Sequence, residues 1–203
     1  MSSTFWDERF RGDEYAYGRE PNDFLRAEAH RIPAGPVLCL AEGEGRNAVF
    51  LARLGHEVTA IDFSLEGLRK TERLAREHGV AVTTVHADLG AYEPETEAFS
   101  GIVAIFAHLP PAVRKRVHEW VPRALRAGGV FLLEAYTPEQ LALGTGGPKD
   151  PAMLMKLAEL EDELAPLTIE LGHEGRREIH EGALHSGPSE TVQLLAIRSS
   201  SSI

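Results

Sequence analysis

The chain has 203 residues, of which 43% are hydrophobic, and its formal net charge is -10 at pH 7. This length allows a single domain with a sizeable core and is too short for two ordinary domains. The acidic charge repels phosphate backbones, no stretch approaches the roughly 18 apolar residues of a membrane span, and the chain opens without a signal-peptide pattern, so we expect a cytoplasmic protein without nucleic-acid or membrane partners.

Residues 1–33 carry several aromatic side chains and precede the first apolar run. Because this segment lies ahead of the predicted sheet, it can fold over a ligand site as a helical cap. The alternative is an amphipathic helix in which Phe5, Trp6 and Phe10 pack on the core, and the two interpretations are equally supported for Trp6. We assign Tyr17 to the ligand site.

Apolar runs then alternate with helical patterns. Strands are predicted at 37–40, 58–61 and 80–85, with one helix from about Arg46 and another between Ser64, as N-cap, and His78-Gly79. This is a βαβαβ arrangement. The only cysteine, Cys39, lies in the first run, so a disulfide and a cysteine-based zinc site are excluded, and we expect it to pack as a small hydrophobic side chain.

The next residues repeat the pattern. A strand is predicted at 101–106, a helix from about Pro110-Pro111 and a strand at 130–134. We interpret the basic run at 114–116 as a solvated face of that helix. Since the apolar runs are continuous, the strands are expected to be buried on both faces, as in a parallel sheet covered by helices.

The C-terminal part changes character. A capping box at 137–140 and a helix-start signal at Asp150-Pro151, before 153–164, predict two more helices. The runs 167–171 and 191–197 have no helical pattern between them and are predicted to form an antiparallel pair. A disordered tail is expected at 199–203.

The most informative motif follows the first strand and reads Ala41-Glu42-Gly43-Glu44-Gly45-Arg46-Asn47-Ala48. Its glycines let the backbone turn tightly and approach a ligand, and the next helix presents unpaired N–H groups. The motif fits the dinucleotide pattern G-x-G-x-x-G/A as well as it fits a methyltransferase loop. Asp62 ends the second strand, where its carboxylate can accept both ribose hydroxyls of an adenosyl group in either class.

Five alternating β/α units finished by an antiparallel pair resemble the class I S-adenosylmethionine-dependent methyltransferases. More narrowly, the chain is similar to the tellurite-resistance methyltransferases and their small bacterial relatives, over residues 38–47, 55–62, 106–110 and 125–129. The resemblance implies a Rossmann-like α/β fold with a mostly parallel seven-stranded sheet, an antiparallel C-terminal strand and helices on both faces. It also implies one domain over 1–198, divided into an N-terminal cap (1–33), a cofactor-binding core (34–136) and substrate-side helices and strands (137–198).

The resemblance implies S-adenosyl-L-methionine as the cofactor. Asp62 would take the ribose and Asp88 the adenine amino group, beside a backbone donor at Leu89; the alternative for Asp88 is a turn-forming role. The predicted cofactor-binding residues lie in the glycine loop and at strand ends: Ala41, Glu42, Gly43, Gly45, Arg46, Asn47, Asp62, Phe63, Ser64, Asp88, Leu89 and Phe106.

The chain departs from the family pattern at two positions of this first motif. An acidic residue is usual where Cys39 stands and glycine where Ala41 stands, so Glu42 is the nearest candidate for contacting the amino group of the cofactor. Glu44 and Arg46 can also simply point to solvent.

Three residues are predicted to act on the acceptor side: His108, Tyr17 and Tyr136. His108 and Tyr136 follow the fourth and fifth strands, at the edge where open α/β sheets bind ligands; the alternative for His108 is capping of the helix at Pro110-Pro111. We predict no metal site among His173, His180, Glu181 and His185, because His180 and His185 would face opposite sides of one strand. Arg177, His180 and His185 can instead line the far side of the acceptor pocket.

These observations predict an S-adenosylmethionine-dependent methyltransferase acting on a small soluble molecule. The resemblance suggests an oxyanion such as tellurite or selenite, or a thiol, and Arg19, Arg46, Arg177 and His108 can in principle stabilise an oxyanion. One alternative is an NAD(P)-dependent oxidoreductase. Against it, the sequence shows no clear sixth βα unit, and this interpretation gives Asp88 no role. The other is a non-catalytic adenosyl-cofactor-binding protein.

Overall fold

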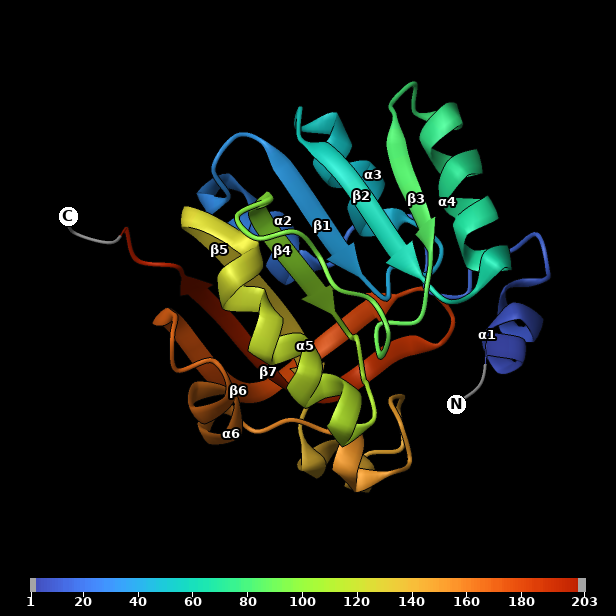
Figure 1. The fold of residues 1–203 in the computed structure, drawn as a ribbon. Helices are drawn as coiled ribbons and strands as arrows, with labels where there is room; N and C mark the ends of the chain where they lie inside the picture. Colours follow the sequence, from blue (N-terminus) through green and yellow to red (C-terminus); the bar gives the residue numbers. More distant parts are fainter. Residues whose placement is uncertain (1–2, 201–203) are drawn as a thin grey trace.

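The computed structural model describes residues 3–200. Its sheet has seven strands in the order β3-β2-β1-β4-β5-β7-β6 (Figure 1). The strands are β1 (Pro36–Leu40), β2 (Glu57–Asp62), β3 (Val82–His86), β4 (Phe99–Ile105), β5 (Leu125–Tyr136), β6 (Thr168–Glu181) and β7 (His185–Ile197). Neighbouring strands from β3 to β5 are parallel, and β7 runs antiparallel to both β5 and β6. The predicted fold class is confirmed.

Alternate residues of the central strands bury against two different layers. Leu38 and Ile102 belong to the cluster that contains Trp120 of α5 (Pro111–Ala124), whereas Cys39 and Val103 belong to the cluster on the other face. Cys39 is fully buried among apolar side chains, as expected for a small hydrophobe, and burial raises the pKa of its thiol well above the usual value. The second cluster is covered by α2 (Asp23–Glu28), the 3-10 helix η1 (Ala29–Arg31) and α3 (Arg46–Arg53).

The helix predicted after the second strand is confirmed as α4 (Leu65–Glu77). Ser64 is its N-cap, and its hydroxyl accepts a hydrogen bond from Gly67 N at 3.2 Å. The chain leaves the helix through Gly79 at a φ of 67°, a conformation that favours glycine.

The two helices predicted in the C-terminal part begin at the predicted residues but differ in type and extent. Thr137 makes no capping hydrogen bond with its side chain, and the segment forms a 3-10 helix, η2 (Pro138–Ala142). The helix predicted at 153–164 is divided into η3 (Pro151–Met153), capped by Asp150, and α6 (Leu157–Glu163). The helix is interrupted because Met155 N donates to the carbonyl of Tyr136 at 3.0 Å, which ties this stretch to the end of β5.

The interpretation of 114–116 as a solvated face is wrong for Arg114. Its side chain is buried, with Nη1 donating to Leu154 O at 3.2 Å and Nη2 to Glu163 at 2.9 Å. It therefore joins α5 to α6 and to the segment before it. Lys115 and Arg116 are exposed, as expected.

The predicted antiparallel pair is the outer end of a longer hairpin. Strands β6 and β7 stay paired from Thr168 with Ile197 to Glu181 with His185, so the hairpin carries its turn back to the edge of the sheet where β1, β4 and β5 end. Within residues 3–200, no helix is long and apolar enough to cross a membrane. Of the predicted tail, residues 201–203 lie outside the described residues.

Candidate active site

The glycine loop lies between the end of β1 and the start of α3. Ala41, Gly43 and Gly45 all have positive φ angles, of 48°, 64° and 91°. A Cβ on Gly45 would lie 2.6 Å from Thr71 Oγ1, so the backbone packs against α4 at a distance that only glycine permits. The ring of Phe10, the last residue of α1 (Ser3–Phe10), covers the loop at Gly43.

Asp62 stands at the end of β2, next to this loop. One carboxylate oxygen accepts from Gly43 N at 2.9 Å and the other from Ser64 N at 2.7 Å. Burial raises the pKa of its carboxyl, and the backbone N–H groups oppose that shift. The Phe63 N–H also faces this carboxylate, whose two oxygens together can accept further hydrogen bonds, so the site fits a ribose diol.

Glu42 occupies the opposite side of the glycine loop. Its Oε1 accepts from Asn47 N at 3.0 Å and Ala48 N at 2.9 Å, at the N-terminus of α3. Desolvation is the main cause that raises the pKa of this carboxyl to about 7. A carboxyl with that pKa beside the glycine loop fits the ammonium group of an amino-acid cofactor, which would favour the ionised form.

Replacing Glu42 by glutamine is expected to stabilise the protein by about 1–3 kcal/mol at pH 8 and to have little effect near pH 5. The folded-state pKa lies above the ordinary value of 4.5, so the stability that Glu42 provides is complete at low pH and is lost as pH rises through about 7. Urea denaturation of both proteins across this range measures the difference. Glu57→Gln, at an exposed glutamate that begins β2, is the control and should show no such pH dependence.

Glu44 and Arg46 point inward, not to solvent. Glu44 is 3% exposed and pairs with Lys70 Nζ at 2.8 Å, while its two oxygens accept from the backbone of Ala16 and Tyr17 at 3.2 Å each. Arg46 is 7% exposed and donates to Glu181 at 2.6 Å. The expectation failed because both side chains meet partners distant in sequence, the N-terminal segment and the β6–β7 turn.

Asp88 and Leu89 follow β3 at the same edge of the sheet. Asp88 is exposed, and its Oδ1 accepts from Gly90 N at 2.8 Å, so it forms the turn that was its alternative role. Its other carboxylate oxygen makes no hydrogen bond among the described residues, which leaves it available to a ligand. Phe63 follows β2, and its carbonyl accepts a hydrogen bond from Nε2 of His86 at 3.1 Å.

Five rings gather on the acceptor side, around the ends of β4 and β5: Phe106, His108, Tyr136, Tyr17 and His185. The His185 ring centre is 4.5 Å from that of Tyr17, 4.6 Å from Phe106 and 5.5 Å from Tyr136. Phe106 has a φ of 52°, a strained conformation for a non-glycine residue, and its ring lies 4.7 Å from Tyr136. The structure thus brings together all three residues predicted for the acceptor side.

His108 is held in one role by its surroundings. Its Nε2 accepts from the backbone N of Tyr136 at 2.9 Å, and burial lowers the pKa of its imidazole to about 4. The ring is therefore neutral at pH 7, with its proton on Nδ1 and no free lone pair for a general base. The alternative capping role is wrong, because the N-cap of α5 is Pro110 and no side chain caps it.

The N-terminal segment closes over these rings. Asp7 of α1 accepts from Ser64 Oγ at 2.6 Å, beside Asp62, and Trp6 stacks on Phe10 at 5.5 Å. Further along, Leu184 N in the β6–β7 turn donates to Ala16 O at 3.3 Å. The covering segment is thus fastened at α4 and at the hairpin.

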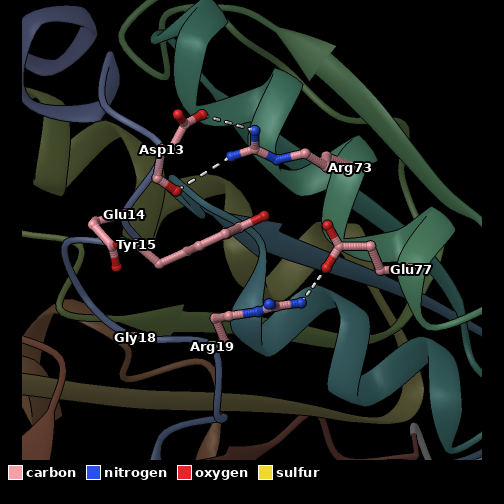
Figure 2. Close-up of a pocket in the computed structure, with 7 residues that line it drawn as sticks. All are labelled: Asp13, Glu14, Tyr15, Gly18, Arg19, Arg73 and Glu77. Atoms are coloured by element: carbon pink, nitrogen blue, oxygen red, sulfur yellow. Dashed lines mark hydrogen bonds and ion pairs between the residues drawn. The ribbon is translucent and has the colours of Figure 1, made fainter.

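Not every cation proposed for the site reaches it. Figure 2 shows a groove beside α4 in which Arg19 pairs with Glu77 and Arg73 with Asp13. Of the residues predicted for the site, only Arg19 lines this groove. His180 is exposed and does not line the acceptor side, whereas His185 is buried there. Among residues 3–200, no group of three or more potential ligands is placed to hold a metal ion.

Residues 37–129, which include the glycine loop, Asp62 and Asp88, match the family model of a methyltransferase domain. This part of the chain therefore has the sequence pattern of a methyltransferase domain. S-adenosyl-L-methionine is the cofactor of the protein. A search of curated proteins finds no match to the chain.

Solved structures resemble the methyltransferase over nearly its whole length. A protein studied in the conversion of a disulfide bond into a thioacetal group during echinomycin biosynthesis has a TM-score of 0.77 and 19% identity, over 98% of this chain and 93% of that one. An S-adenosylmethionine-dependent methyltransferase from Methanosarcina mazei has a TM-score of 0.70 and 16% identity, over 89% and 99%. TehB from Haemophilus influenzae has a TM-score of 0.64 and 18% identity, over 98% and 67%. At these identities the likeness shows the fold.

A buried polar network beside the site was missed from the sequence. Glu134 is fully buried and accepts from Asn22 at 2.5 Å, from Arg177 at 2.8 and 3.0 Å and from Gln193 at 2.8 Å. Glu181 accepts from Asn22 and Arg177 as well as from Arg46. The one available signal was Glu134 itself, a charged residue that ends an otherwise apolar run.

Proposed function

We propose that the protein transfers the methyl group of S-adenosylmethionine to a small soluble acceptor, an oxyanion such as tellurite or selenite, or a thiol. The observation that carries this proposal is the cluster of five rings at the ends of β4, β5 and β7, adjacent to the glycine loop. When bound, the cofactor supplies a methyl group on a positively charged sulfur. Aromatic faces favour such a cation, and a closed site excludes competing water.

The residues on the acceptor side favour a nucleophile that needs no strong base. His108 has no free lone pair to accept a proton, and burial lowers the pKa of His185 well below its usual value. Burial raises the pKa of the Tyr136 and Tyr17 hydroxyls, so both stay neutral at pH 7. These side chains position an acceptor, and a polarizable atom such as selenium, tellurium or a thiolate sulfur can attack without further activation.

The test is a turnover assay with methyl-labelled S-adenosylmethionine and separate additions of selenite, tellurite and small thiols. We expect formation of S-adenosylhomocysteine and a labelled product with at least one of these acceptors. Tyr17→Leu should lower that turnover at least tenfold, whereas Tyr15→Leu, in the groove of Figure 2, should not. If S-adenosylhomocysteine binds but no acceptor is methylated, the non-catalytic alternative replaces this proposal.

A further inference from the structure

Three buried polar atoms around the ring cluster make no hydrogen bond of standard geometry. They are Arg46 Nη1, the Nδ1 of His185 and the hydroxyl of Tyr136, beside which the Ser189 side chain also lies. Arg46 is 7% exposed, His185 8% and Tyr136 fully buried. A buried polar atom without a partner is destabilising, and more so when it is charged, so the presence of these atoms points to a ligand that would pair with them.

The three groups belong to different elements but face one region. The rings of His185 and Tyr136 are 5.5 Å apart, and Arg46 is the charged group that most strongly disfavours protonation of His185. Glu181 pairs in register with His185 across the β6–β7 turn and binds Arg46 through Nη2 at 2.6 Å. That ion pair aims the other guanidinium nitrogen, Nη1, away from Glu181.

The charges behind Arg46 are already balanced. Glu134 and Glu181 face Arg46 and Arg177, and the exposed carboxylate of Asp23 also pairs with Arg177 at 3.7 Å, so no positive charge in this network lacks a carboxylate partner. None of these carboxylates contacts Arg46 Nη1. Arg46 Nη1 is thus a donor without an acceptor, and the Tyr136 hydroxyl and His185, in its Nδ1–H tautomer, can donate beside it, which is an arrangement that suits an anion.

We propose that Arg46, His185 and Tyr136 bind an anionic group of the methyl acceptor, a carboxylate or an oxyanion of similar size, while Phe106 and Tyr17 contact the rest of the molecule. Arg46 and His185 are then specificity-determining residues. The proposal rests on the proposed methyltransferase function and narrows its acceptors to acids.

An anion in this site would change the protonation of His185. The charged and titratable groups that face or surround His185 come from every neighbouring element: Arg9, Tyr17, Arg46, His108, Tyr136, Arg177 and Glu181. In their presence burial and positive neighbours lower its pKa well below the usual value. A bound anion offsets that repulsion, so the pKa of His185 should rise on binding.

The experiment follows the imidazole signals of histidine-labelled protein by NMR, with saturating S-adenosylhomocysteine, during titration with benzoate, its neutral analogue benzamide, and selenite. We expect benzoate and selenite to bind and to raise the pKa of His185, and benzamide to bind at least tenfold more weakly. His185→Phe and Tyr136→Phe keep the packing and should each weaken benzoate binding about tenfold. Arg46→Lys keeps the positive charge but lacks the second guanidinium nitrogen, and it should also weaken benzoate binding. His173→Phe, at an exposed position of β6, should leave benzoate binding unchanged.

Two results would overturn the proposal. One is equal binding of benzoate and benzamide. The other is a His185 shift produced by S-adenosylhomocysteine alone, absent with 5′-methylthioadenosine, together with exclusion of benzoate, because the cofactor's own carboxylate would then hold the site. If the proposed methyltransferase function itself is wrong, S-adenosylhomocysteine should fail to bind in the same samples, which distinguishes that outcome from failure of the anion site.

Discussion

Replacement of Asp62 by alanine is expected to weaken binding of S-adenosylhomocysteine about a hundredfold. We propose that the carboxylate accepts two ribose hydroxyls. Hydrogen bonds to a charged group contribute about 1.5 kcal/mol or more each, which together correspond to two orders of magnitude in affinity. Its loss also frees Gly43 N and Ser64 N, which hold the glycine loop to the start of α4. Isothermal titration calorimetry measures the change.

The matched control is Asp13→Ala, an aspartate whose side chain is fully exposed in the groove beside α4. It should bind S-adenosylhomocysteine as the unaltered protein does. Asp62→Asn, which keeps the shape of the side chain, separates loss of charge from loss of packing and should also bind weakly. Unchanged affinity in both Asp62 variants would show that the ribose does not lie at the end of β2.

Replacement of Glu134 by alanine is expected to lower the free energy of unfolding by about 3–5 kcal/mol. Glu134 is fully buried and is the shared acceptor for Arg177, Asn22 and Gln193. Without it, the positive charge of Arg177 loses its bidentate partner, and the buried amide of Asn22 and the half-buried amide of Gln193 each lose an acceptor. Urea denaturation followed by circular dichroism measures the loss.

Glu93→Ala supplies the comparison for this second prediction. Glu93 pairs with Arg116 and Arg123 on the surface, where its side chain is 54% exposed, so its removal should change stability by no more than about 1 kcal/mol. A comparably small loss for Glu134→Ala would mean that water satisfies the network and that it does not brace the site. A loss of about 3–5 kcal/mol for Glu134→Ala, larger than the loss for Glu93→Ala, would support the conclusion that the buried network fixes the position of Arg46.

The sequence predicts those parts of the fold that depend on residues close to one another in the chain. Continuous apolar runs give buried parallel strands, the hydroxyl of Ser64 begins α4, and paired glycines mark the loop at the end of β1. Asp62 and Asp88 follow from the same logic, since a polar residue that ends a parallel strand must reach the ligand-binding edge. In contrast, the single helix predicted at 153–164 is divided because Met155 N donates to the carbonyl of Tyr136 at the end of β5.

The polar half of the site could not be predicted because its contacts are distant in sequence. Asn22 caps α2, which a local pattern can suggest, but its amide also bonds Glu134 and Glu181, 112 and 159 residues away. The hairpin from 172 to 190 is polar and mostly exposed, so no apolar alternation reveals that its turn returns His185 to the site. The inward orientation of Arg46 depends on that same turn.

The most direct test of the central claim is calorimetric titration of the unaltered protein with S-adenosylhomocysteine and, separately, with NADH. An adenosyl-cofactor site at the glycine loop predicts saturable binding of one S-adenosylhomocysteine per chain and no saturable binding of NADH. Saturable NADH binding without S-adenosylhomocysteine binding would contradict the methyltransferase assignment.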